Sequence, residues 1–370
     1  MADMDDLFGA APDAAADAGP GDQTRGRGRP IGPAAQDPAV AAIGATLPAS
    51  IHLGTSSWSF PGWAGIVYDV PAAESLLSRK GLAAYARHPV LRAVGIDRGF
   101  YQPLMAPEYA AYAEQVPETF RFLVKGPARV TDEMRRDDSG RGTAPNPHFL
   151  NAQLAVDEFV KPAIAGLGDK AGPLTLQFSP LARRTLADVP AFIARLHAFL
   201  WAINKKCEGF ANRPQLAVEV RNPELLTYEF AVALKDAGAC YCLGVHARMP
   251  TAEEQLPLLR ALWPGPLVAR WSLHAGHAYE EAKAGYAPFN RLVDEDPDTR
   301  ATLARVAAAT ARAGYPATII ANNKAEGSAP LTLIKLAEAI NALSGAAKNA
   351  ETDTAENTAK GSAAGAGARD

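Results

Sequence analysis

The sequence predicts an α/β protein built as a TIM-type (β/α)8 barrel, and three observations support this prediction. Eight short β-rich runs recur between residues 49 and 345, and each is followed by a turn signal and then by helical material. The span of about 300 residues suits that fold. Within the runs, apolar and polar residues alternate as a barrel wall requires. An open doubly wound sheet is the alternative, but that fold rarely needs eight strands in such even succession.

The predicted strands, in chain order, are Ile51–Ser56, Ala93–Asp97, Phe120–Lys125, Pro173–Gln177, Gln215–Val220, Cys240–Val245, Leu267–Ser272 and Ala317–Ala321. Ala- and Leu-rich segments lie between them. Three of these segments, 186–201, 227–237 and 331–343, are the most strongly helical in composition. Each strand is therefore expected to pair with a helix, as in βα units.

Alternation along the strands predicts which side chains enter the barrel. In the fifth strand Leu216, Val218 and Val220 share one face, which the surrounding helices require to be apolar. Glu219 and Arg221 must then point inward. The same test on the other strands gives Asp97, Lys125, Gln177, His246, Arg270 and His274 as inward residues at the carboxyl ends. The last strand leaves open whether Asn322 or Asn323 points inward.

The two ends of the chain differ from this core in composition. Residues 1–48 and 346–370 are rich in Ala, Gly, Pro and Asp or similar small and polar residues, and are poor in aromatics. Such segments bury too little apolar area to offset the entropy of ordering, so both are predicted to be disordered tails around a barrel of residues 49–345.

A short basic motif lies in the N-terminal tail. Arg27-Gly28-Arg29-Pro30 resembles the core of an AT-hook, whose arginines enter a narrow minor groove. The motif occurs once and aspartates surround it, so a solvated linker is the preferred interpretation. The whole chain carries 37 basic against 40 acidic residues, a net charge of −3. This balance argues against a nucleic-acid coat or a membrane-surface protein.

The sequence indicates the cellular compartment of the protein but not its oligomeric state. The three cysteines cannot form a disulfide framework, and the acidic start lacks the pattern of a signal peptide. No apolar run approaches the roughly 18 residues of a membrane span. We therefore expect a cytoplasmic protein without a membrane contact, and the oligomeric state stays open.

The inward polar residues predict a site at the barrel mouth, since active sites of this fold lie at the carboxyl ends of the strands. Ser56 and Trp58 join the set from the first strand. Ionisable groups inside a barrel are costly unless they are paired or functional. Two interpretations remain: a polar ligand pocket, or a buried salt-bridge network that ties strands together.

The charges suggest a ligand class. Lys125, Arg221 and Arg270 supply fixed positive charge, and Glu219 is the carboxylate placed as a general acid or base. We predict Glu219, Lys125 and Arg221 as catalytic residues acting on a small anionic or polyhydroxylated metabolite, such as a sugar or sugar phosphate. The remaining candidates are predicted to bind substrate.

Two loops at the mouth extend this prediction. Gly327 and Ser328 precede the last predicted helix, where the helix N-terminus could bind phosphate or Ser328 could simply cap. Trp58 and Trp63 flank a Pro-Gly loop after the first strand. Their rings could stack on a sugar or base, or could plug the end of the barrel.

No cofactor is predicted. His246, His274, His277, Asp97 and Glu219 could in principle bind a divalent metal, but the chain has no HExxH or HxH motif. A metal site is therefore a minor alternative. Cys240 and Cys242 share one strand face and are interpreted as small buried hydrophobes. Motifs of nucleotide binding and of serine hydrolases are also missing from the sequence.

Six motifs together resemble the DUF72 (YecE-like) family, a family of unknown function. They are the stretches 54–65, 100–101, 120–127, 176–180, 217–223 and 322–330, and they span nearly all of the predicted barrel. The resemblance implies a TIM barrel and no established reaction. It marks Ser56, Trp58, Lys125, Gln177, Glu219, Arg221, Asn322 and Asn323 as matching motif positions. The sequence departs from the family pattern near Asp97, at His246, and between Arg270 and His274.

Three hypotheses for function follow, in this order. The first is the metabolite enzyme described above. The second is a metal-assisted phosphodiester or nucleic-acid enzyme, by analogy with barrel endonucleases. The third is a binding module that senses a metabolite without turnover.

Overall fold

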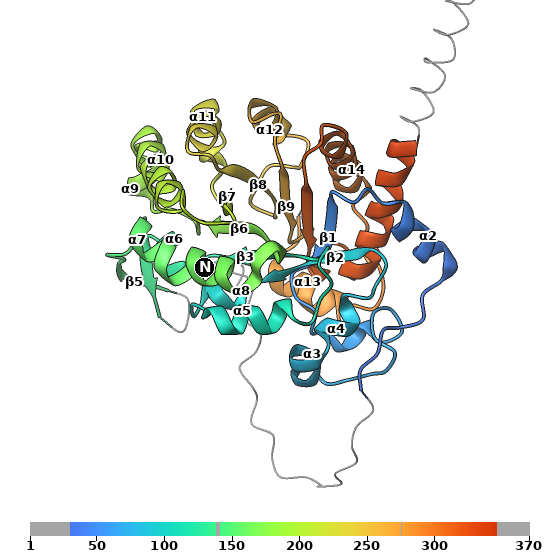
Figure 1. Ribbon diagram of the computed structural model, residues 1–370. Helices are drawn as coiled ribbons and strands as arrows, with labels where there is room; N and C mark the ends of the chain where they lie inside the picture. The colour runs from blue at the N-terminus through green and yellow to red at the C-terminus, as the bar shows by residue number, and fades with distance from the viewer. Residues whose placement is uncertain (1–29, 138–140, 275, 346–370) are drawn as a thin grey trace, which may run out of the picture.

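A closed parallel barrel forms the centre of the molecule, as the computed structural model of the chain describes for residues 30–137, 141–274 and 276–345. Neighbouring strands follow the order β1-β10-β9-β8-β7-β6-β3-β2, and helices surround the barrel (Figure 1). The predicted fold class is confirmed.

The eight barrel strands are β1 (Ile51–Thr55), β2 (Leu91–Ile96), β3 (Arg121–Lys125), β6 (Ala171–Gln177), β7 (Gln215–Glu219), β8 (Cys240–Val245), β9 (Leu267–Trp271) and β10 (Ala317–Ala321). Each end lies within two residues of its predicted position. Two short strands, β4 (Met134–Arg136) and β5 (Gly142–Pro145), form a separate antiparallel pair that the sequence did not predict.

The helices of the outer layer are α3 (Glu74–Lys80), α4 (Leu82–Tyr85), α5 (Ala106–Ala113), α6 (Ala128–Thr131), α7 (Ala152–Ala155), α8 (Lys161–Leu167), α9 (Arg183–Leu186), α10 (Val189–Lys206), α11 (Tyr228–Asp236), α12 (Leu256–Ala261), α13 (Tyr279–Tyr286), α14 (Pro297–Arg312) and a last helix at 329–345. The long helices α10 and α14 begin alike. Asp188 and Asp296 cap them by accepting from backbone N–H groups, and a proline follows in the first turn. None of the helices in the described parts of the chain is long and apolar enough to cross a membrane.

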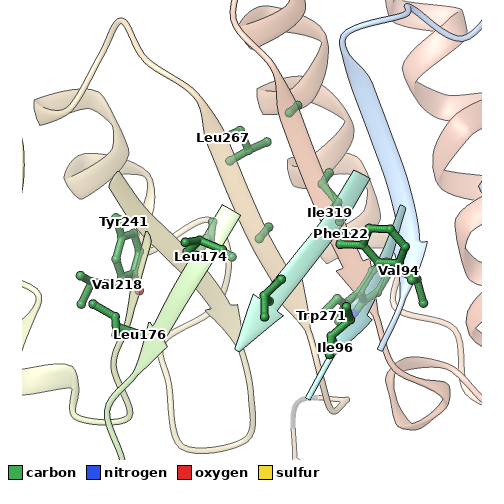
Figure 2. Close-up of a cluster of buried hydrophobic side chains, with 14 of the residues drawn as sticks. Val94, Ile96, Phe122, Leu174, Leu176, Val218, Tyr241, Leu267, Trp271 and Ile319 are labelled. Atoms are coloured by element: carbon green, nitrogen blue, oxygen red, sulfur yellow. The ribbon is translucent and has the colours of Figure 1, made fainter. Parts of the chain in front are cut away.

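The hydrophobic core has two layers, as the alternation predicted. The larger lies between strands and helices and includes Val94, Phe122 and Val218, which Figure 2 shows on the strands. The smaller fills the barrel interior and consists of Ala93, Leu123, Ala217, Cys242, Val268 and Ile320. Because adjacent residues such as Ala217 and Val218 fall in different layers, the predicted facing of the strands is confirmed.

The barrel closes between its first and last strands. β1 and β10 pair in continuous register from Ile51 with Ala317 to Thr55 with Ala321. On its other side β1 pairs with β2, with an irregularity at Gly54. A Cβ atom at Gly54 would lie 2.0 Å from the carbonyl oxygen of Ala93, so only glycine fits this close approach of the two strands.

The predicted disorder of the N-terminal tail is wrong for residues 30–48. This segment contains α2 (Pro38–Thr46), which Asp37 caps and which lies beside the last helix (Figure 1). Arg92 donates to the carbonyl oxygens of Gly44 at 2.7 Å and Pro48 at 2.9 Å, and Asn341 donates to that of Ile43 at 2.9 Å. These partners order a segment whose composition alone favours disorder. The rest of both predicted tails, 1–29 with most of the AT-hook-like motif and 346–370, lies outside the described residues.

Candidate active site at the barrel mouth

Glu219 and Arg270 form the centre of the polar group at the carboxyl end of the barrel. Glu219 ends β7 and Arg270 lies near the end of β9, with β8 between them. Arg270 Nη1 donates to Glu219 Oε2 at 2.9 Å, and Arg221 Nη2 lies 2.7 Å from Glu219 Oε1. Gly244 of β8 pairs in register with Arg270, and a Cβ there would lie 3.5 Å from Glu219. A methyl group would just fit at this position, so a small residue here leaves room for the pair to meet across β8.

Arg270 also connects the pair to two further strands. Its Nη1 donates to Gln177 Oε1 of β6 at 2.8 Å, and its Nη2 donates to Asp97 Oδ2, just after β2, at 3.0 Å. Together with Lys125 of β3, these residues are called the mouth network below: Asp97, Lys125, Gln177, Glu219, Arg221 and Arg270. The structure thus brings together six of the predicted site residues.

Glu219 is an ionised carboxylate. It is completely buried, which by itself would raise its pKa, but the charges of Arg221 and Arg270 and the hydrogen bond from Arg270 more than offset burial and lower the pKa to about 2. Burial would also lower the pKa of Arg270, but the negative charges of Glu219 and Asp97 outweigh it and raise this pKa above its usual value. A group with so low a pKa is a poor proton donor or acceptor at neutral pH. The geometry therefore argues against the predicted acid–base role of Glu219 and favours a role in holding the two arginines.

Lys125 has the opposite environment. It ends β3, is only 3% exposed, and places its Nζ 3.6 Å from the centre of the Phe100 ring, in η2 (Arg98–Phe100). In the described parts of the chain no carboxylate oxygen lies within ion-pair distance of Nζ. Burial lowers the pKa of Lys125 to about 8, although Asp97 and Glu219 act to raise it. Sequence reasoning missed Phe100, whose ring compensates part of the lost hydration.

The mouth network has an excess of one positive charge, because Lys125, Arg221 and Arg270 face two carboxylates. Several of its buried polar atoms have no hydrogen-bond partner among the described residues: Asp97 Oδ1, Glu219 Oε1, Gln177 Nε2, and Arg221 Nε and Nη1, although Glu219 Oε1 has its ion pair with Arg221. Buried polar groups are normally satisfied. The three unsatisfied donor atoms outnumber the two acceptors, so the arrangement is suited to an anionic or hydroxyl-bearing ligand.

The two asparagines after β10 have different roles. Asn322 is on the face of Ile320, which points into the barrel, and its Nδ2 donates to Ser56 Oγ at 2.9 Å. Asn323 is buried, and its Oδ1 accepts from the backbone N–H of Ala329 at 2.9 Å and from Trp63 Nε1 at 3.3 Å. The open choice is thus resolved: Asn322 points inward, and Asn323 caps the last helix.

Three predicted binding residues, Trp58, Gly327 and Ser328, are covered by other parts of the chain. Trp58 is buried in the hydrophobic core, where its Nε1 donates to Leu77 O at 3.2 Å, so the ring packs within the protein rather than offering a stacking surface. A Cβ at Gly327 would lie 2.6 Å from Arg291 O, so the chain at Arg291 already covers this glycine. Ser328 is completely buried. The cover by Arg291 and the burial of Ser328 argue against the predicted phosphate site at Gly327 and Ser328.

The histidines lie in the loops that follow the strands. His246 is buried just after β8, and its Nδ1 accepts from Arg248 N at 3.4 Å. His274, after β9, lies 3.9 Å from Asp294, a residue that sequence reasoning did not consider. Asp294 precedes α14 in a segment without strand or helix signals, so no local pattern marks it.

Two hollows of about 280 and 220 Å3 lie at the other end of the barrel. Asn204, Lys205, Cys207 and Glu208, at and just after the end of α10, line the first. The starts of β7, β8 and β9 line the second, with Cys240 and Trp263. Burial raises the pKa of Cys240 to about 11, so this thiol is not an activated nucleophile. The interpretation of Cys240 and Cys242 as packing residues agrees with this, and the mouth network remains the candidate active site.

Comparison with known proteins gives a family and a fold. A family described as "Protein of unknown function DUF72" matches residues 52–357. A DUF72 family protein from Enterococcus faecalis V583 has 16% sequence identity and a TM-score of 0.54, and the match covers 79% of this chain and 95% of that one. One from Thermotoga maritima MSB8 has 15% identity and a TM-score of 0.43, with 78% and 98% covered. No curated protein matches the sequence. At 16% identity the Enterococcus faecalis structure supports the barrel fold alone.

Proposed function

From the premise that this chain belongs to the DUF72 family, whose function is unknown, we propose that the protein is an enzyme acting on a small anionic or polyhydroxylated metabolite at the barrel mouth. Lys125 is the general acid or base that exchanges a proton with the substrate, and Arg221 binds the anionic group of the substrate. Glu219 and Arg270 hold these two side chains in position. The observation that carries the proposal is a buried lysine without a carboxylate ion pair in the described structure, at the end of the barrel where active sites of this fold lie.

The pKa of Lys125 suits proton transfer. With a pKa of about 8, roughly a tenth of the side chain is neutral at pH 7, whereas an ordinary lysine is almost wholly protonated. Groups that exchange protons near neutral pH are the most effective general acids and bases. The neutral amine is also a nucleophile toward a carbonyl carbon, so a substrate with an aldehyde or ketone group is within reach of the same side chain.

The charge and donors of the mouth network suggest the substrate class. Its excess positive charge is matched by one carboxylate or by a phosphate. Arg221 Nε and Nη1 are unsatisfied charged donors on different sides of one guanidinium, each able to bind one anionic oxygen, and Gln177 Nε2 is a donor for a hydroxyl. A sugar phosphate or a hydroxy acid carries both functions.

The proposal is tested with defined compounds in two steps. Inorganic phosphate, aldose phosphates, hydroxy and oxo acids, and uncharged sugars are screened for binding by thermal shift and titration calorimetry. The compounds that bind are then followed by NMR for turnover. The variants are Lys125→Met and Arg221→Met, and Lys235→Met on the exposed face of α11 is the matched control.

We expect an anionic compound to bind, Arg221→Met to weaken its binding, and Lys125→Met to abolish turnover while binding persists. Lys235→Met should change neither. If Arg221→Met leaves binding unchanged, the site is elsewhere. If the wild-type protein binds a compound but never converts it, the protein is instead a metabolite-binding module, the third of the hypotheses above.

A further inference from the structure

A cluster of metal-ligating side chains lies in the loops after β9, and it shares no residue with the mouth network. His274, His277 and Asp294 each offer one ligand atom, and these atoms all lie within 4.8 Å of one another. His277 Nε2 is 2.7 Å from Asp294 Oδ2, and His274 Nε2 is 3.9 Å from Asp294 Oδ1. On a tetrahedral zinc ion, nitrogen and oxygen ligands are about 3.4 Å apart. The observed separations bracket that value, so small side-chain rotations suffice.

The backbone brings the three residues together through a shared loop. His274 N donates to Lys324 O at 3.0 Å, while Val293 N and Asp294 N donate to Glu326 O at 2.8 and 3.3 Å. Both ligand-bearing segments are thus attached to Lys324 and Glu326, in and just after η6 (Asn323–Ala325). The positions of His274 and Asp294 do not depend on the contact between their side chains.

The surroundings favour a bound cation. Asp294 and the neighbouring Glu281 carry two negative charges, and Glu281 Oε2 lies 4.0 Å from His277 Nδ1, the ring nitrogen that a metal on Nε2 would leave free. A carboxylate hydrogen-bonded to that nitrogen commonly orients a metal-binding histidine; at 4.0 Å Glu281 is beyond hydrogen-bond range, and a rotation of its side chain would bring it into contact. Tyr286 donates to Asp294 Oδ2 at 3.5 Å. The three ligands are neither buried nor fully exposed, so an ion has access to them.

We propose that His274, His277 and Asp294 form a binding site for one divalent transition-metal ion, with zinc as the best fit to two imidazoles and one carboxylate. Three protein ligands leave a coordination position for water or a substrate atom, as in catalytic zinc sites. Glu281 supports the site by orienting His277. The proposal stands apart from the proposed function, since either can be true without the other.

The test uses the full-length untagged protein, stripped of metal with a chelator. Zinc affinity and stoichiometry are measured by competition with a chromophoric chelator, and Co2+ is added as a spectroscopic probe. Variants are His277→Gln and Asp294→Asn for the ligands, and Glu281→Gln for the supporting carboxylate. His197→Gln is the matched control, because His197 lies 2.6 Å from Asp236 in an equally close histidine–carboxylate pair that belongs to no such three-residue cluster in the described structure.

We expect one zinc ion per chain and visible Co2+ absorption bands of a four- or five-coordinate site. Each ligand variant should lose more than about 100-fold in zinc affinity, Glu281→Gln about 10-fold, and His197→Gln nothing. If the wild type binds substoichiometric zinc, or if His197→Gln costs as much as His277→Gln, the proposal is wrong. Should the ligand variants fail to fold, the Co2+ spectrum and stoichiometry of the wild type decide.

Discussion

Replacing Glu219 with glutamine should destabilise the barrel by an amount that the structure allows us to calculate. Gln is isosteric, so the change removes the charge that Arg221 and Arg270 share and leaves the packing unchanged. The carboxyl pKa falls from 4.5 to about 2 on folding. Each unit is worth about 1.4 kcal/mol, so the charge contributes roughly 3 kcal/mol at neutral pH. Breaking a buried pair by removing one partner typically costs about 3–5 kcal/mol, which agrees.

The assay is thermal and urea unfolding of the wild type and the variant. With an unfolding entropy of about 2.1 cal/mol/K per residue over about 300 residues, a loss of 3 kcal/mol lowers the midpoint by roughly 5 °C. Glu208→Gln is the control, because both side chains of the Lys205–Glu208 ion pair are exposed and the pair should contribute nothing measurable to the free energy of unfolding.

The pH dependence gives a second and independent check. Because the folded pKa lies below the unfolded one, the stabilisation is complete above about pH 5.5 and is lost as the pH falls through 4.5 toward 2. The difference between wild type and Glu219→Gln should therefore stay constant at higher pH and shrink below pH 4.5. An unchanged or raised midpoint for Glu219→Gln at pH 7 would refute the view that this carboxylate holds the arginines.

Three further predictions concern buried groups. Lys125→Met should unfold at the same or a higher temperature at pH 7. Between pH 8 and 10.5 the unfolded wild type holds one more proton than the folded protein, so the stability of the wild type rises with pH in this range, and Lys125→Met should lack this rise. A lower unfolding midpoint of Lys125→Met at pH 7 would contradict the prediction. Burial lowers the pKa of His88 to about 4, so stability should fall as the pH drops from 6.5 to 4, and His88→Gln should flatten that slope in urea titrations. Burial raises the pKa of all three thiols, and Cys207 and Cys242 are buried, so a disulfide reagent at pH 8 should label these two only after denaturation.

The barrel was predictable because each strand carries its own signal. Leu216, Val218 and Val220 identify the outer face of β7 without reference to any other part of the chain, and Glu219 follows as an inward residue. The same local logic gave all eight strands to within two residues. It also found the members of the mouth network, since inward polar residues at strand ends are visible in the sequence.

Features that depend on distant partners were not predictable in this way. Helix α2 is ordered by Arg92 and Asn341, the latter 298 positions from Ile43, while four of its nine residues are alanine. The low pKa of Glu219 arises from arginines on β9 and after β7, so its charge state follows only from the assembled site. Asn323 and Gly327 belong to a loop motif that suggested a ligand, yet the chain itself occupies that space.

The closure of the barrel by pairing of β1 with β10 also has a consequence for how the protein folds during synthesis. Asn322 and Ser56, which meet there, are 266 positions apart, so nearly the whole barrel leaves the ribosome before the first strand meets its last partner. Until then the growing sheet has two open edges, with the amide groups of β1 free to pair with another chain. Translation speed over the final stretch and access to chaperones should therefore determine the yield of folded protein.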